Sequence, residues 1–210
     1  MALKDVDLKY QQGVLTTSKS LAVGGGLSVA GAAVNGIQSA DHGFLAWNFD
    51  PILVQGANNT NTQGTVFLNA IKFRQARTVS NLHVYVSTAG TTITSGQNWI
   101  GLIAPDGTLL ASTSMDTAFA STGLKTMAIT AQSVSASWYW VALLPNMTGT
   151  AAQLLVANAN GATQNLSPNI GLSAASYRCA VNGVTQTSLA SITPANNSTT
   201  GAKPFWVAAS

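Results

Sequence analysis

The segment SLAVGGGLSVAGAAVNG, residues 20–36, contains two hexads in which leucine, valine and glycine recur six positions apart. Its apolar repeat positions are Leu21, Val23, Leu27 and Val29. One copy of this segment cannot bury those side chains against itself, because glycine supplies no packing surface. Three copies wound about an axis would point them inward at every turn, so the repeat predicts an oligomerisation neck over residues 20–42. A glycine-rich hinge is the alternative interpretation.

The composition favours an all-β protein. Hydrophobic residues make up 46% of the 210 residues, charged residues make up only 7%, and every acidic residue is aspartate. Soluble domains usually carry about 25% charged residues, and glutamate and lysine are the residues that sustain exposed helices. Threonine, serine, asparagine, valine and glycine fill the chain instead, which is typical of strands and turns. Surface charge keeps monomers apart. A surface with so few charges is therefore typical of an oligomer or of a protein fixed in a larger assembly.

Residues 43–210 are predicted to form one antiparallel β-sandwich of the jelly-roll type, because short apolar runs recur with turn signals between them. In residues 80–87, Leu82, Val84 and Val86 alternate with His83 and Tyr85. The run at 137–144 is apolar on both faces and is predicted to be a central strand. Strands are expected at 44–49, 65–74, 80–87, 98–104, 109–113, 124–130, 137–144, 153–159 and 204–209, with long loops or irregular strands over 160–200.

Residues 1–19 form a polar lead that holds five of the fifteen charged residues. Within it, Val6, Leu8 and Tyr10 alternate with Asp7 and Lys9, a pattern that could add a strand to a neighbouring sheet. We interpret this lead as an extended arm that anchors the chain to a larger particle, and a frayed terminus is the alternative. It lacks the apolar core of a signal peptide, and no apolar run approaches the length of a membrane span, so synthesis in a cytoplasm without membrane insertion is expected.

The sequence predicts no enzyme, no cofactor and no metal. The β domain and its entry hold only four acidic residues, and these fit no catalytic carboxylate pair: Asp41, Asp50, Asp106 and Asp116. Asp50 and Asp106 adjoin prolines and are interpreted as turn residues. No nucleophile elbow or phosphate loop is present, and a zinc site would need His42 and His83 to recruit a carboxylate. An ion held by a ring of His42 side chains on a three-fold axis is the alternative.

Three further residue classes limit the possible functions: the cysteine, the basic residues and the tryptophans. Cys179 is the only cysteine, so no internal disulfide is possible, and we expect it to be a small buried hydrophobe. The nine basic residues are scattered, so no nucleic-acid partner is expected. Of the five tryptophans, Trp138 and Trp140 are predicted to be core residues, because they lie in the most apolar strand. Trp99 alternates with Ile100 and Leu102, and we predict that it is exposed and is the surface or glycan contact.

Two stretches resemble surface proteins of tailed-bacteriophage virions. The neck LAVGGGLSVAGAAVNG is similar to the repeats that trimerise phage fibres and spikes. The stretch ARTVSNLHVYVSTAG…NWIGLIAPDGTLLASTS…WYWVALL, within residues 76–144, resembles the jelly-roll domains of phage minor tail and capsid-decorating proteins. The resemblance implies a structural homotrimer without catalytic residues. Residues 1–19 would dock on the major capsid protein or a tail protein, and residues 43–210 would face outward.

The resemblance leaves more than one location and role open. The short neck favours a capsid decoration protein or head fibre. A tail fibre or receptor-binding protein that contacts a host-surface glycan is the first alternative. A non-viral carbohydrate-binding β-sandwich module is the second.

Overall fold

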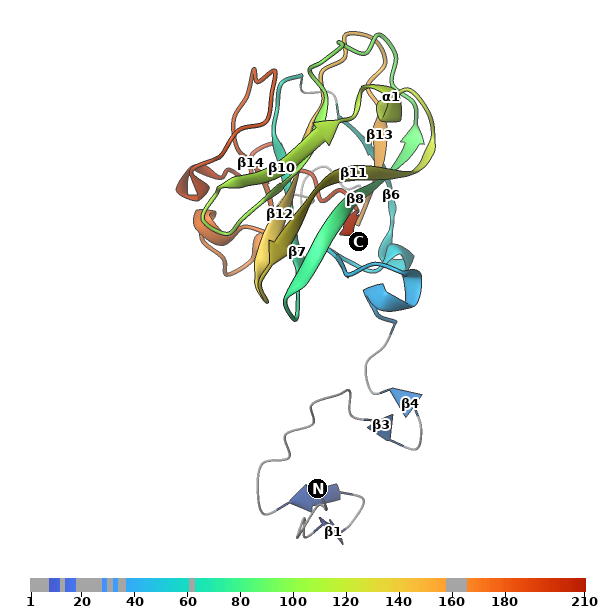
Figure 1. Cartoon of the computed structure of the whole chain (residues 1–210), viewed down its shortest axis with the longest axis vertical. Helices are drawn as coiled ribbons and strands as arrows, with labels where there is room; N and C mark the ends of the chain where they lie inside the picture. Colours follow the sequence, from blue (N-terminus) through green and yellow to red (C-terminus); the bar gives the residue numbers. More distant parts are fainter. Residues whose placement is uncertain are drawn as a thin grey trace. The chain divides into compact units, whose positions relative to one another are not determined.

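A computed structural model of the chain describes residues 8–11, 14–17, 28–29, 32–33, 37–60, 63–157 and 166–210 (Figure 1). The chain divides into two compact units, residues 1–38 and 39–210. In the first unit, β1 (Leu8–Gln11) pairs antiparallel with β2 (Val14–Thr17), and β3 (Ser28–Val29) pairs with β4 (Ala32–Ala33).

The predicted arm and neck residues fall partly within these short strands. Leu8 and Tyr10 lie in β1, which pairs with β2 of the same chain, and Val29 lies in β3. Val6, Leu21, Val23 and Leu27 lie outside the described residues. Two predictions therefore stay untested: anchoring by Val6, Leu8 and Tyr10, and oligomerisation by Leu21, Val23, Leu27 and Val29.

The second unit contains two antiparallel sheets, as the predicted all-β sandwich requires. The five-stranded sheet has the order β10 (Leu109–Ser114), β9 (Trp99–Ile103), β12 (Trp138–Leu144), β7 (Phe67–Lys72), β14 (Cys179–Val181). The six-stranded sheet has the order β5 (Ala46–Trp47), β15 (Val207–Ala209), β8 (Arg77–Thr88), β13 (Gln153–Val156), β6 (Gly56–Asn59), and β11 (Gly123–Val134) also pairs with β8. The jelly-roll topology stays a prediction.

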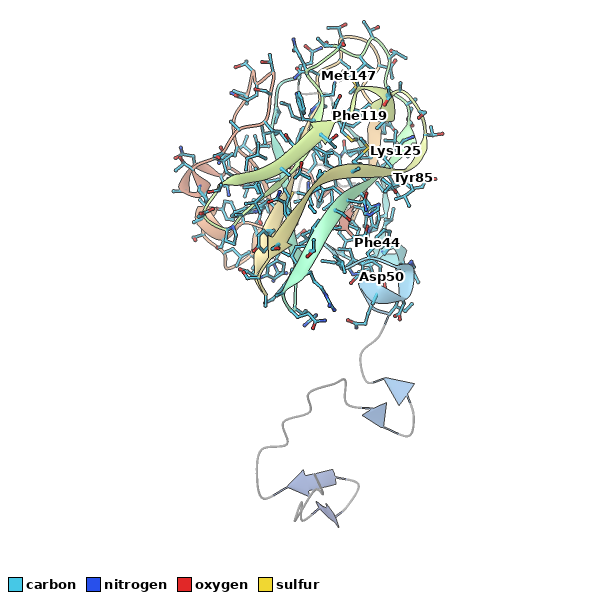
Figure 2. The ribbon with its side chains drawn as sticks, in the orientation of Figure 1. Phe44, Asp50, Tyr85, Phe119, Lys125 and Met147 are labelled. Atoms are coloured by element: carbon cyan, nitrogen blue, oxygen red, sulfur yellow. The ribbon has the colours of Figure 1, made fainter. Side chains whose placement is uncertain are left out.

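Helical structure in the described residues is limited to single turns. One α-helical turn, α1, spans Asp116–Phe119. The 3-10 turns span Ser39–His42 (η1), Pro51–Leu53 (η2), Ser167–Asn169 (η3), Ala174–Ser176 (η4) and Pro194–Asn196 (η5). Figure 2 shows Phe44 and Asp50 at one end of the sandwich and Phe119 and Met147 towards the other.

The inner core confirms the predicted alternation of β8. Leu82, Val84 and Val86 are fully buried between the sheets, whereas Tyr85, on the other face, is 38% exposed. Phe67 of β7 and Phe205 pack edge to face across the interior, with ring centroids 5.3 Å apart. Such aromatic pairs add about 0.5–1.5 kcal/mol to what their buried area contributes.

A second apolar cluster covers the outer face of the five-stranded sheet. Leu68 and Ala142 point to this face, and Leu189 and Ile192 of the irregular C-terminal segment pack on them. We name residues 166–200 the cover: they contain β14 and the turns η3, η4 and η5. The cover explains why β12 is apolar on both faces, and β12 is central in its sheet as predicted.

Candidate functional site

The structure separates the two tryptophans of β12. Trp140 is 5% exposed, and its Nε1 donates a hydrogen bond to the carbonyl oxygen of Tyr177 at 2.8 Å. Trp138 is 37% exposed. The prediction that both are core residues is therefore confirmed for Trp140 and wrong for Trp138. The reason is position: Trp138 is the first residue of β12 and lies opposite exposed Lys72, the last residue of β7, at the end of the sheet.

Trp138 and Trp140 line an open cleft of about 240 Å³ on the outer face of this sheet. Two segments supply most of its other walls: Pro105 comes from the β9–β10 turn, and Leu172, Tyr177 and Arg178 come from the cover. Ala70, Ser137, Ala175 and Ser176 complete the lining. A mostly apolar concave surface with a few polar groups is the usual character of a small-ligand site.

Two cations lie close to the Trp138 ring. The Nζ atom of Lys72 lies 5.1 Å from the ring centroid, and the Cζ atom of Arg178 lies 4.8 Å from it. At exposed sites such cation–π contacts contribute about 0.5–1 kcal/mol each. Both side chains are exposed, and neither forms an ion pair with a carboxylate of the described residues. Their positive charge is therefore available to a ligand.

A second cavity, of about 260 Å³, shares Ala70 and Arg178 with the first. Asn69 lines it, is fully buried, and has no hydrogen-bond partner for either its amide nitrogen or its amide oxygen. Cys179 lines the same cavity, and burial raises the pKa of its thiol. The predicted buried role of Cys179 is confirmed, and a thiol that resists ionisation is a poor nucleophile.

Trp99, the predicted surface contact, lies at the other end of the sheet from Trp138. It is opposite Leu144, the last residue of β12, and it is half-buried against the outer cluster. Its Nε1 donates a hydrogen bond to the carbonyl oxygen of Thr187 at 3.2 Å. The prediction that Trp99 is exposed is therefore wrong, because its ring packs on the outer cluster. The structure does not bring Trp99 into the cleft, and its contact with a glycan stays a prediction.

His83 is buried on the outer face of the six-stranded sheet. Its Nε2 lies 2.9 Å from the Ser210 hydroxyl, its Nδ1 lies 3.2 Å from the Thr126 hydroxyl, and Phe44 packs edge-on against the ring. Burial lowers the pKa of His83. A nucleophilic triad needs a carboxylate to orient the histidine, and here the second ring nitrogen faces a threonine instead.

The acidic side chains near the sandwich stabilise turns. Asp50 accepts a hydrogen bond from the Ile52 backbone nitrogen at 2.9 Å and so caps η2. Asp106 accepts one from the Thr108 backbone nitrogen at 2.9 Å, which lowers the pKa of Asp106. Both predicted turn roles are confirmed. Asp116 accepts hydrogen bonds from Gly96 and Asn98.

His42, the proposed ion ligand, is exposed and packs edge-on against Trp47, with ring centroids 5.1 Å apart. Within the described residues, no three histidine, cysteine or acidic side chains cluster closely enough to hold a metal ion. In the same part of the chain, no helix has the length and apolar character needed to cross a membrane.

Comparison with protein-family models, with curated proteins and with solved structures finds no match to the chain. The cleft beside Trp138 is therefore the candidate site on the strength of its own geometry.

Proposed function

We propose that the chain is a structural protein of a phage virion surface, a homotrimer whose N-terminal segment attaches to the capsid while its β-sandwich faces outward. The observation that carries the proposal is the division of the chain after Gln38 into a small N-terminal unit and a compact sandwich of residues 39–210. A segment with repeated Leu-x-Val-x-Gly hexads joined to such a sandwich is the organisation expected of an anchor, a neck and a displayed knob.

Exposed apolar side chains near the start of the sandwich support assembly. Ile52 is 77% exposed and Leu53 is 58% exposed, side by side on η2. The Asp50 cap holds this turn in place, at the end of the sandwich that Figure 2 marks with Asp50. Single exposed apolar residues are ordinary, but an adjacent pair on a fixed turn is typical of a surface that another chain covers. A second copy of this chain would bury the Ile52 and Leu53 side chains.

The tail receptor-binding alternative gains support from the cleft beside Trp138. A displayed knob that recognises a cell surface needs a concave site with polar anchors, and the cleft has both. A non-viral carbohydrate-binding module would use the same cleft but would act as a monomer without residues 1–38.

The location on the virion is tested with phage particles produced from the genome that encodes this chain. Peptides of the protein should be found in purified particles at a copy number that is a multiple of three. A variant lacking residues 1–19 should be absent from particles while its sandwich remains folded. Particles that lack the protein altogether, or that incorporate the truncated variant at the full level, would contradict the proposal.

A further inference from the structure

We propose that the cleft beside Trp138 binds one pyranose ring that carries an anionic substituent, as in an acidic polysaccharide. The ring would lie against the exposed part of Trp138, and its anion would meet Arg178 and Lys72. The inference rests on the cleft and not on where the protein resides, so its test is separate from the test of virion location.

The shape and lining of the cleft favour a sugar ring. The aliphatic face of a pyranose packs against an indole, and Trp138 leaves 37% of its surface open for such a contact. Pro105, Leu172 and the buried Trp140 extend the apolar surface on which the ring would rest. Ser137 and Ser176 also line the cleft and place hydroxyl groups beside it, where sugar hydroxyls need partners.

The charges of the cleft favour an anion. Arg178 lines the cleft directly, and its planar guanidinium can hold a carboxylate or sulfate through two parallel hydrogen bonds. Lys72 adds a second positive charge beside the same indole. Asp106, next to Pro105 in the chain, does not line the cleft, and its carboxylate is bonded to its own turn. An anion would therefore meet Arg178 in the cleft, with Lys72 beside the same indole, and neither cation has a carboxylate partner among the described residues.

Other anionic polymers and partners fit this surface less well. Single-stranded nucleic acid is held by successive exposed aromatic rings along a basic track, whereas this cleft has one exposed indole and one lining cation, Arg178, with Lys72 beside the indole. A stable protein partner usually needs a contact of about 20–30 residues on each side, whereas ten residues line this cleft.

The test measures binding by isothermal titration and by saturation-transfer NMR on the full chain. The probes are oligomers of galacturonic acid, a sulfated galactose oligomer of equal length, and neutral galactose oligomers as the uncharged control. We expect at least one of the two acidic probes to bind at least tenfold more tightly than the neutral one. Binding should weaken as salt is added, because the anion is held by exposed cations. Comparison of the two acidic probes distinguishes a carboxylate from a sulfate.

Variants locate the binding in the cleft. Trp138→Ala and Arg178→Gln should each weaken binding of the acidic oligomer at least tenfold, and Trp138→Tyr should retain most of it. Lys125→Gln removes a half-buried cation of the other sheet and serves as the charge-matched control, with no change expected. Melting temperatures confirm that each variant is folded, and Arg178→Gln keeps the test decisive if Trp138→Ala does not fold.

Several results would overturn the inference. These are equal binding of neutral and acidic oligomers, no binding of any probe at millimolar concentration, unchanged affinity in folded Trp138→Ala and Arg178→Gln, or tighter binding of a poly-deoxythymidine oligonucleotide than of the acidic sugars.

Discussion

Trp138 and Trp140 lie two residues apart on one face of one strand, yet they have opposite environments. The backbone carbonyl of Tyr177 in the cover accepts the indole hydrogen bond of Trp140, which is buried, while Trp138 is exposed close to Lys72 and Arg178. Because both tryptophans belong to the same strand, the difference in their burial depends on which part of the sheet the cover packs against. Where the cover packs on the sheet it completes a second core, and at the end of the sheet it leaves a cleft.

The largest expected effect separates these two tryptophans by stability. Trp140→Ala should lower the free energy of unfolding by about 3–5 kcal/mol, because it removes a large buried side chain from the outer cluster. Trp138→Ala should cost about 1 kcal/mol or less, the scale of an exposed cation–π contact. Urea denaturation of both variants beside the unmodified protein measures the two values. Equal losses of unfolding free energy in the two variants would contradict the division of the outer face into a packed cluster around Trp140 and an open end at Trp138.

The next effect tests how the cover is attached to the sheet. Gly107 has a φ of +94°, and a Cβ added there would lie 2.1 Å from the carbonyl oxygen of Ile192 in the cover. Gly123 has a φ of +107° with open space around it. Gly107→Ala should therefore cost about 2–4 kcal/mol, whereas Gly123→Ala should cost only the backbone strain of about 1–2 kcal/mol. Thermal or urea unfolding of the two variants compares them, and equal losses would contradict a tight contact between turn and cover.

The smallest expected effect concerns the other sheet, whose outer face carries His83. Burial lowers the pKa of His83 in the folded state, so between that value and the ordinary histidine pKa of about 6.5 the unfolded chain binds more protons. Stability should therefore fall as the pH drops below about 6.5. Unfolding measured at pH 5 and pH 7.5 should show a smaller difference in His83→Gln than in the unmodified protein.

A difference between pH 5 and pH 7.5 that is as large in His83→Gln as in the unmodified protein would show that the burial of His83 is not its cause.

The inner core was predictable from the sequence because it depends on local alternation. Leu82, Val84 and Val86 point inward as their spacing predicts, and the two apolar faces of β12 predicted its central position. Strand β6 was not predicted, because its sequence GANN has turn-forming residues and becomes a strand only through pairing with β13.

The candidate site was not predictable in the same way. Its residues come from three distant parts of the chain: Lys72 ends β7, Trp138 begins β12, and Arg178 precedes β14. Only the strand register and the path of the cover bring them together. The polar residues Ser135 and Ser137, just before Trp138, were the one local signal that this tryptophan stands at a strand end, where burial is incomplete.

Native mass spectrometry of the full-length chain, beside residues 39–210 alone, tests most directly whether this is a knob carried by an oligomerising neck. The account predicts a trimer for the full chain and a monomer for residues 39–210, which form a compact unit of their own. A full-length monomer would contradict the neck, and a trimer that persists without residues 1–38 would place the assembly contacts in the sandwich instead.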